Sequence, residues 1–214
     1  MDNGVHVIVN PIKEASDVGV ESFYEVGFMD EPKGMVQSSH LLGHLVCYSP
    51  GAGFEAKEAM NWLNEKGMAN AETMPDYTHY DYSVPANDLE KVFEIEAARL
   101  TQTKFDADMI AFEAKRVYSE TDAVERIPRA GMAKHAFMAL SHAWRHQSNE
   151  ALVRGGLEDM DRGKLFEFYK STYAPQNLTL IVTGKTTVDQ VKDCLLYTSP
   201  SPRDATLSRM PSSA

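Results

Sequence analysis

The chain has 214 residues and a formal net charge of −10, and its hydrophobic (43%) and charged (24%) contents are ordinary for a globular protein. An acidic surface of this size argues against nucleic acid as a partner, because phosphate binding needs clustered Lys and Arg. No apolar run reaches the ~18 residues that a membrane-spanning helix needs, so we expect no membrane span.

The first third of the chain predicts two strands followed by two helices. Residues 5–9 are a β-rich run that ends at Asn10 and Pro11, and residues 18–26 form a second candidate strand. A helix is expected to begin near Ser38 or Ser39, either of which can cap it. Residues 55–66 form a second helix, which Gly67 ends in the C′ position.

The remaining pattern mixes helices and strands. Residues 77–84 alternate as a strand does, with one face made of Thr78, Tyr80, Tyr82 and Val84. Helices are predicted over residues 86–101, 106–123, 132–140 and 161–173, and an apolar strand over residues 178–183 ends at Gly184. Strands separated unevenly by helices favour an α+β fold over a regular doubly wound sheet.

The C-terminal residues do not follow this pattern. Hydrophobic patterning stops at Asp193, and residues 194–203 back-translate to a transposase adaptor used in sequencing libraries. We therefore expect residues 194–214 to be a non-native tail without a packed contribution. We expect residues 1–193 to form one domain, truncated at its C-terminal end. With Cys194 set aside, Cys47 is the only cysteine, which excludes an internal disulfide.

Two histidines four residues apart, His40 and His44, carry most of the chemical information. On a helix they lie one turn apart on one face, where both imidazoles can reach one metal ion. The stretch matches the inverted zinc-protease pattern H-x-x-E-H, except that Gly43 stands at the glutamate position. In that chemistry the histidines hold Zn²⁺, and the glutamate takes the proton of the attacking water.

A catalytic zinc site usually has a third protein ligand, commonly a glutamate. Glu113 and Glu120 lie seven residues apart, which is two turns on the same face of the predicted 106–123 helix. By itself such a pair is more typical of a solvated acidic stripe than of a metal site.

Taken together, these features resemble the pitrilysin/insulinase family of zinc peptidases, which includes the mitochondrial processing peptidases. The resemblance runs from Asn3 to about Val191. Besides the histidines and the spacing of 76 residues from His44 to Glu120, it rests on four segments: a first strand at residues 3–9, a G-S-x-x-E-x-x-G-like stretch at 27–34, Asn70-Ala71 with the strand at 77–85, and a Y-x-P-x-N turn at 173–177.

This resemblance implies a mixed, largely antiparallel sheet covered by helices, as in the metallopeptidase fold. It also implies Zn²⁺ bound by His40, His44 and Glu120, with Glu113 supporting a ligand from behind. Asn70 and Ala71 would bind substrate at a sheet edge that receives the peptide as an added strand. The implied partners are a peptide or protein substrate and a homologous second domain or subunit, while no compartment is implied.

Gly43 is the departure from the family, because the general base is missing, and loss of such a base typically costs ~10²–10⁴ in rate. Three explanations stay open: a real loss, a one-base sequencing error, and, least favoured, a base supplied from elsewhere. The predicted function is a zinc metalloendopeptidase-like domain that is impaired as written. The alternative is a non-catalytic partner or scaffold subunit of the same fold. S-ribosylhomocysteine lyase has a similar motif, but it uses a Cys as third ligand, so Glu120 favours the peptidase.

Overall fold

The computed structural model describes residues 3–101, 105, 107–125, 129, 132, 157 and 160–198. Its centre is a five-stranded sheet with the strand order β1-β5-β2-β4-β3. The strands are β1 (His6–Pro11), β2 (Asp17–Tyr24), β3 (Met68–Thr73), β4 (Thr78–Pro85) and β5 (Leu178–Gly184). Only β1 and β5 pair in parallel, and the other neighbours are antiparallel. The prediction of an α+β fold with a mixed, largely antiparallel sheet is confirmed.

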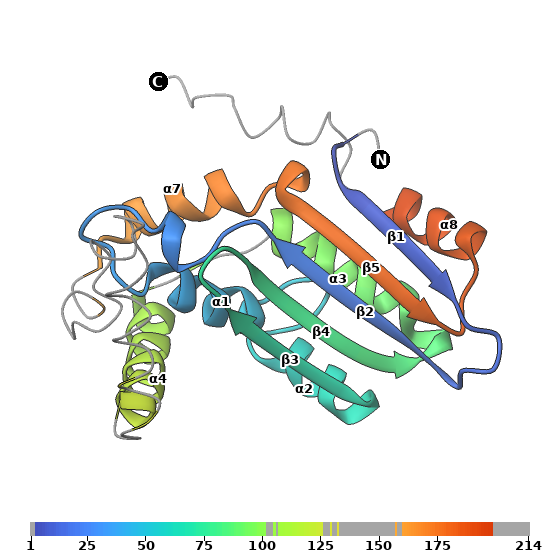
Figure 1. Ribbon diagram of the computed structural model, residues 1–214, viewed down its shortest axis with the longest axis horizontal. Coiled ribbons are helices and arrows are strands. Elements are labelled where there is room, and N and C mark those ends of the chain that lie inside the picture. The colour runs from blue at the N-terminus through green and yellow to red at the C-terminus, as the bar shows by residue number, and fades with distance from the viewer. Residues whose placement is uncertain are drawn as a thin grey trace.

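Helices cover one face of this sheet and extend beyond one end of it (Figure 1). They are α1 (Ser38–Tyr48), α2 (Glu58–Lys66), α3 (Leu89–Thr101), α4 (Ala107–Glu125), α7 (Arg162–Thr172) and α8 (Val188–Thr198), with short 3₁₀ turns at η1 (Phe28–Asp30), η2 (Ala86–Asp88) and η3 (Pro175–Asn177). In Figure 1, α2 and α3 lie behind the sheet, while α4 stands beyond its end next to α1. Among the described residues, no helix combines the length and the apolar character that crossing a bilayer requires.

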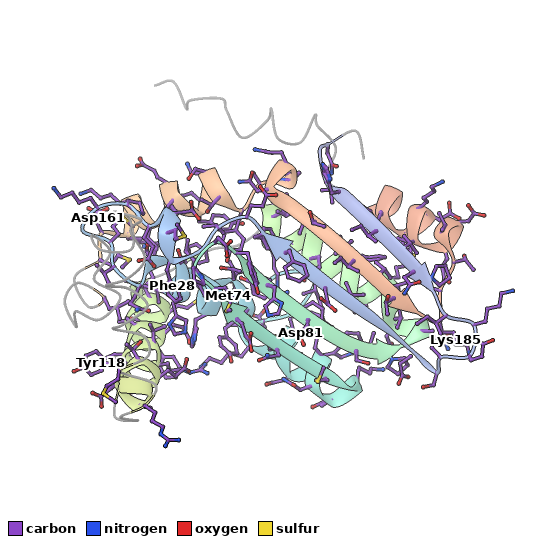
Figure 2. All side chains as sticks on the ribbon, viewed as in Figure 1. Phe28, Met74, Asp81, Tyr118, Asp161 and Lys185 are labelled. Atoms are coloured by element: carbon purple, nitrogen blue, oxygen red, sulfur yellow. The ribbon has the colours of Figure 1, made fainter. Side chains whose placement is uncertain are left out.

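The period-two pattern of the strands explains why the described helices lie against one face of the sheet. The alternate residues of β4 that were predicted to share a face are all buried against the helices: Thr78, Tyr80, Tyr82 and Val84. The residues between them point to the other face and stay partly exposed, as Asp81 does (Figure 2).

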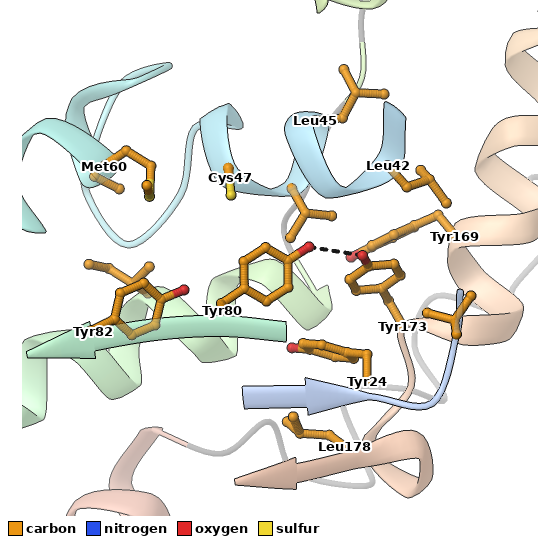
Figure 3. Close-up of a cluster of buried hydrophobic side chains, with 14 of the residues drawn as sticks. Tyr24, Leu42, Leu45, Cys47, Met60, Tyr80, Tyr82, Tyr169, Tyr173 and Leu178 are labelled. Carbon is orange, nitrogen blue, oxygen red and sulfur yellow. Dashed lines mark hydrogen bonds between the residues drawn. The ribbon is translucent and has the colours of Figure 1, made fainter. Parts of the chain in front are cut away.

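A cluster of aromatic and aliphatic side chains fixes α1 on the sheet (Figure 3). The hydroxyl groups of Tyr80 and Tyr173 are 2.8 Å apart and hydrogen bonded, and the Tyr24 ring packs on that of Tyr173 at 4.6 Å. Leu42 and Leu45 of α1 are both fully buried, Leu42 near the Tyr169 ring and Leu45 on the side of α1 that faces away from the sheet. Because Tyr173 follows α7 while Tyr80 belongs to β4, the cluster ties α1 to distant parts of the chain.

The helix boundaries differ from the sequence expectation by up to three residues, and the second helix shows this at its start. The second helix begins at Glu58 rather than at residue 55. Gly67 ends it as predicted, but with an extended backbone (φ 179°) rather than a left-handed one. The glycine is required by close approach, because a Cβ atom there would lie 2.0 Å from the carbonyl oxygen of Ser83.

The expectation that the C-terminal tail packs nowhere is wrong for its first residues. Helix α8 continues past Asp193 to Thr198, and Leu195 is buried in the core with Val191, four residues earlier on the same helix face. Cys194 is partly buried against the same core. The adaptor origin of residues 194–214 stays a prediction, and residues 199–214 and 133–140, the latter within a predicted helix, lie outside the described residues.

Candidate metal centre

The histidines of α1 and the second glutamate of α4 come together where these two helices pack. The rings of His40 and His44 lie with their centroids 4.9 Å apart. The Oε2 atom of Glu120 is 3.4 Å from Nε2 of His40 and 3.2 Å from Nε2 of His44. One ligand atom from each of the three side chains lies within 4.8 Å of the other two. Two residues one turn apart and a third 76 positions later therefore share one point in space.

Each imidazole is held from behind through its other nitrogen. Nδ1 of His44 is 3.1 Å from Oε2 of Glu113, which is fully buried. Nδ1 of His40 is 3.2 Å from Oε1 of Gln37. When a metal occupies Nε2, the proton of each ring sits on Nδ1 and is donated to these oxygens. This is the tautomer that binds a metal through Nε2.

The start of α1 is fixed by a buried carboxylate rather than by the predicted serine caps. The two carboxylate oxygens of Glu31 accept hydrogen bonds from the backbone N–H groups of Gln37 and Ser39, each at 3.0 Å. Burial raises the pKa of Glu31 to about 8, although these two donors act in the opposite direction. The Ser39 hydroxyl donates to the carbonyl oxygen of Gly27 at 2.8 Å instead of capping the helix. Gln37 takes the left-handed conformation (φ 67°) at the cap position.

The turn η1 and the loop after β3 support α1 from the same side. The backbone N–H of Phe28 donates to the carbonyl oxygen of Met74 at 3.1 Å, and the Phe28 ring lies edge-on to the His40 ring at 6.3 Å. Figure 2 shows Phe28 and Met74 near each other beside α1, whereas Tyr118 of α4 points away from the sheet. The turn η1 and the loop after β3 thus flank the His40 side of the centre.

Gly43 occupies the buried side of α1 between the two histidines and faces β3. A Cβ atom at this position would lie 3.1 Å from Oγ1 of Thr73 and 3.9 Å from Cγ2 of Thr78. The first contact is tighter than normal packing by a few tenths of an ångström, and the hydroxyl is a movable group. The fold therefore leaves room for a side chain at position 43 if Thr73 adjusts slightly.

An open cavity of about 670 Å³ lies between α1, α4 and strand β3. His40, His44, Glu120 and Gly43 line one part of it, and Asn70 and Ala71 line the strand side. Ala71 faces the helices, whereas the alternating pattern exposes Asn70. In the described sheet, β3 is an edge strand whose outer side pairs with no other strand. All sequence-predicted site residues thus border one cavity except Glu113, which lies buried behind His44.

The donor set fits a divalent transition metal. Two imidazole nitrogens and one carboxylate oxygen are the ligands of many catalytic zinc sites. The pKa of Glu120 lies below its ordinary value because its carboxylate is hydrogen bonded to His40 and lies close to His44. The Cys47 side chain points from α1 toward the sheet core (Figure 3), and burial raises the pKa of its thiol to about 11. Cys47 is thus a buried apolar residue here rather than a ligand.

Sequence reasoning did not identify Gln37 and Glu31, which support this centre, or Arg116, which lines the same cavity. Gln37 lies three residues before His40, but a left-handed glutamine cannot be read from the sequence. Glu31 contacts the start of α1 only through the intervening turn. Arg116 precedes Glu120 by four residues, and this i,i+4 spacing was a usable signal that both side chains share a helix face.

The sequence of the chain is similar to those of known peptidases. The sequence profile described as insulinase (peptidase family M16) matches residues 5–154. The chain is 25% identical over 179 residues to insulin-degrading enzyme-like 1, peroxisomal, from Arabidopsis thaliana, which covers 78% of this chain and 18% of that protein. A second relative from that organism, insulin-degrading enzyme-like 2, is 22% identical over 214 residues, which is 21% of its length. The chain therefore spans about a fifth of the length of these relatives.

Solved structures share the fold. A protease from Helicobacter pylori superposes with a TM-score of 0.80 at 20% identity, over 92% of this chain and 48% of that one. Pitrilysin superposes with a TM-score of 0.79 at 16% identity, over 95% of this chain and 22% of its own. In both cases the agreement covers nearly the whole chain described above.

Proposed function

The chain belongs to the insulinase family of peptidases (peptidase family M16), and on that premise we propose that it is a zinc-binding metalloendopeptidase-like domain that acts on peptides and lacks its general base. The observation that carries the proposal is the convergence of His40, His44 and Glu120 within 4.8 Å. That the chain is a peptidase-family domain with a metallopeptidase fold rests on the family match and on the shared fold.

In this proposal His40, His44 and Glu120 hold Zn²⁺. When bound, zinc supplies a Lewis acid that activates water and polarises a peptide carbonyl. Glu113 and Gln37 keep the two rings in the metal-binding tautomer through their contacts with Nδ1. None of these residues is placed to act as the base, because Glu113 is fully buried behind His44.

The substrate would lie along β3. The outer edge of this strand offers backbone N–H and C=O groups, and an extended peptide can pair with them as an added strand. Asn70 and Ala71 stand on that strand beside the cavity, so they are the residues that we propose to contact the peptide. A peptide paired with the β3 edge would pass Gly43 and the three proposed zinc ligands, because β3, Gly43 and these ligands line the same cavity.

Gly43 favours a second candidate function, a partner or scaffold subunit of the same fold that binds peptide without cutting it. A working site needs a group that takes the proton from the attacking water, and Gly43 has no side chain to do so.

The chain covers only 48% of the Helicobacter pylori protease that shares its fold. We propose that a homologous second domain or subunit completes the substrate site.

Metal content and peptide cleavage, measured on the same preparation, test the proposal. After dialysis against zinc, mass spectrometry should find one zinc per chain, and Glu120→Ala or His44→Ala should lose it. His79→Ala is the matched control, because His79 pairs with Glu72 on the other face of the sheet. Hydrolysis of an unstructured peptide should be slow or absent.

The other outcomes discriminate between the alternatives. Peptide binding without any zinc would replace the peptidase proposal with the scaffold function. Rapid hydrolysis that a chelator stops would show that a base other than the residue at position 43 operates.

A further inference from the structure

Arg116 is a fixed cation within the cavity that the proposed zinc and peptide roles do not use. It lies on α4, one turn before Glu120, and lines the cavity together with it. Its Nη1 atom donates to Oε2 of Glu113 at 3.2 Å, and its Nη2 atom donates to the hydroxyl of Tyr48 at 3.2 Å. The guanidinium also stacks over the Tyr48 ring, 4.7 Å from the centroid. These contacts hold its position, which lowers the entropy cost of binding a ligand.

The charge of Arg116 is accessible although it contacts Glu113. The Glu113 carboxylate is completely buried, whereas the Arg116 side chain keeps 37% of its surface exposed. A guanidinium has five N–H groups, and the two hydrogen bonds above occupy only two of them. A ligand carboxylate could therefore contact the outer N–H groups from the cavity side, while Glu113 contacts the guanidinium from its buried side. A planar guanidinium is well suited to such a bidentate contact.

The shape of the cavity brings a peptide side chain to this position. Successive side chains of a strand paired with β3 alternate between the two faces of the sheet. Those on the helix side would pass Ala69 and Ala71, which are small and face the helices. The same region is lined by Tyr48, Asn64 and Arg116. Among the described residues that line the cavity, Arg116 is the only one with a permanent positive charge.

We propose that Arg116 forms a subsite that selects peptides carrying an acidic side chain, Asp or Glu, on the helix side of the added strand. The inference rests on the proposed peptide binding along β3 and adds a substrate class to it. Arg116 acts as a specificity-determining residue in this proposal. It does not take part in the hydrolytic step.

Equilibrium binding to pairs of short peptides tests this subsite. The two peptides of a pair are identical except for Glu or Gln at one position, and that position is moved along the peptide from pair to pair. Fluorescence anisotropy with the zinc-loaded chain gives the affinities. Because position 43 carries no general base, we expect the peptides to stay uncleaved during the measurement. We expect one position, or two positions two residues apart, at which Glu binds about fivefold to tenfold more tightly than Gln.

Variants assign that preference to one side chain. Arg116→Gln keeps an N–H donor for Glu113 but removes the charge, so the preference should fall to about one, with zinc content unchanged. Arg116→Lys should keep part of the preference. Lys115→Met is the matched control, because Lys115 is an exposed cation next to Arg116 that does not line the cavity. If Arg116→Gln fails to fold, Arg116→Met decides in its place.

The outcomes separate this inference from the proposed function. Peptides that bind with no Glu preference, or with a preference that survives Arg116→Gln, would overturn the subsite and leave peptide binding intact. A preference lost equally in Lys115→Met would reduce Arg116 to a general charge effect and also overturn the proposal. If no peptide of either kind binds to the zinc-loaded chain, the peptide-binding function fails and the subsite fails with it.

Discussion

Restoring a glutamate at position 43 is the perturbation whose effect can be worked out furthest from the structure. Gly43 lies within α1, where replacing glycine by another residue gains about 0.5–1 kcal/mol of helix stability. Against this gain, the new Cβ atom meets Oγ1 of Thr73 at 3.1 Å, so that hydroxyl must move by a few tenths of an ångström. Mild overpacking of this kind costs about 1 kcal/mol. The net change in unfolding free energy should therefore stay within about 1 kcal/mol of zero.

The effect on activity should be far larger than the effect on stability. A positioned general base contributes ~10²–10⁴ in rate. The zinc-loaded Gly43→Glu variant should therefore cleave a fluorogenic peptide ~10²–10⁴ times faster than the unchanged chain, and a chelator should abolish the gain. Gly43→Gln is the control, because it has the same size and the same contact with Thr73 but cannot take a proton.

Two results would refute this reasoning. A Gly43→Glu variant that binds one zinc per chain, folds normally and stays inert would show that the missing glutamate is not what limits catalysis. A Gly43→Gln variant as active as Gly43→Glu would show that the gain comes from filling space rather than from a base.

Three further predictions concern the residues that support the ligands. Glu113→Gln should weaken zinc binding by about 10–100-fold, measured by competition with a chelating dye, because His44 loses the carboxylate that orients it; unchanged affinity would remove Glu113 from the site. Gln37→Gly should raise the melting temperature, because it removes the cost of roughly 1 kcal/mol of a non-glycine residue in the left-handed conformation. The same variant should weaken zinc binding, because His40 loses its contact with Gln37. A zinc affinity equal to that of the unchanged chain would contradict this role of Gln37. Burial raises the pKa of Glu31 to about 8, above the ordinary value of 4.5, so its neutral form stabilises the fold and this stability is lost as pH rises from about 4.5 to 8. Urea unfolding of the zinc-free chain should therefore show a free energy of unfolding that falls by up to about 1.4 kcal/mol per pH unit over this range, and Glu31→Gln should flatten the slope.

The parts of the fold with strong periodicity were predictable from the sequence. Alternation in β4 gave its buried face, and the spacing of His40 and His44 gave their common side of a helix. Strand β3 has no apolar face, since it alternates exposed residues with two alanines and a threonine, so only the family resemblance indicated a sheet edge there. The burial of Leu195 was not predicted, because residues 194–203 were set aside as adaptor-derived and the four-residue spacing between Val191 and Leu195 was therefore not considered.

The support of the site was less predictable than its ligands. The spacing of His40 and His44 identified two of the ligands, because a turn of helix brings residues four apart onto one side. The third ligand, Glu120, was indicated only by the family resemblance. Glu31 and Gln37 act through a turn and a left-handed residue, and neither conformation has a periodic signature. Arg116 could have been placed beside Glu120 from its spacing, but its contacts with Tyr48 and Glu113 depend on how α1 packs on α4.

We propose that one metal ion joins α1 to α4, and anomalous scattering at the zinc edge is the most direct test of this metal site. In a crystal of the zinc-loaded chain, we predict a single anomalous peak bound to Nε2 of His40, Nε2 of His44 and a carboxylate oxygen of Glu120, each at about 2.0–2.2 Å. No peak at this position, or a peak that excludes Glu120, would contradict the account.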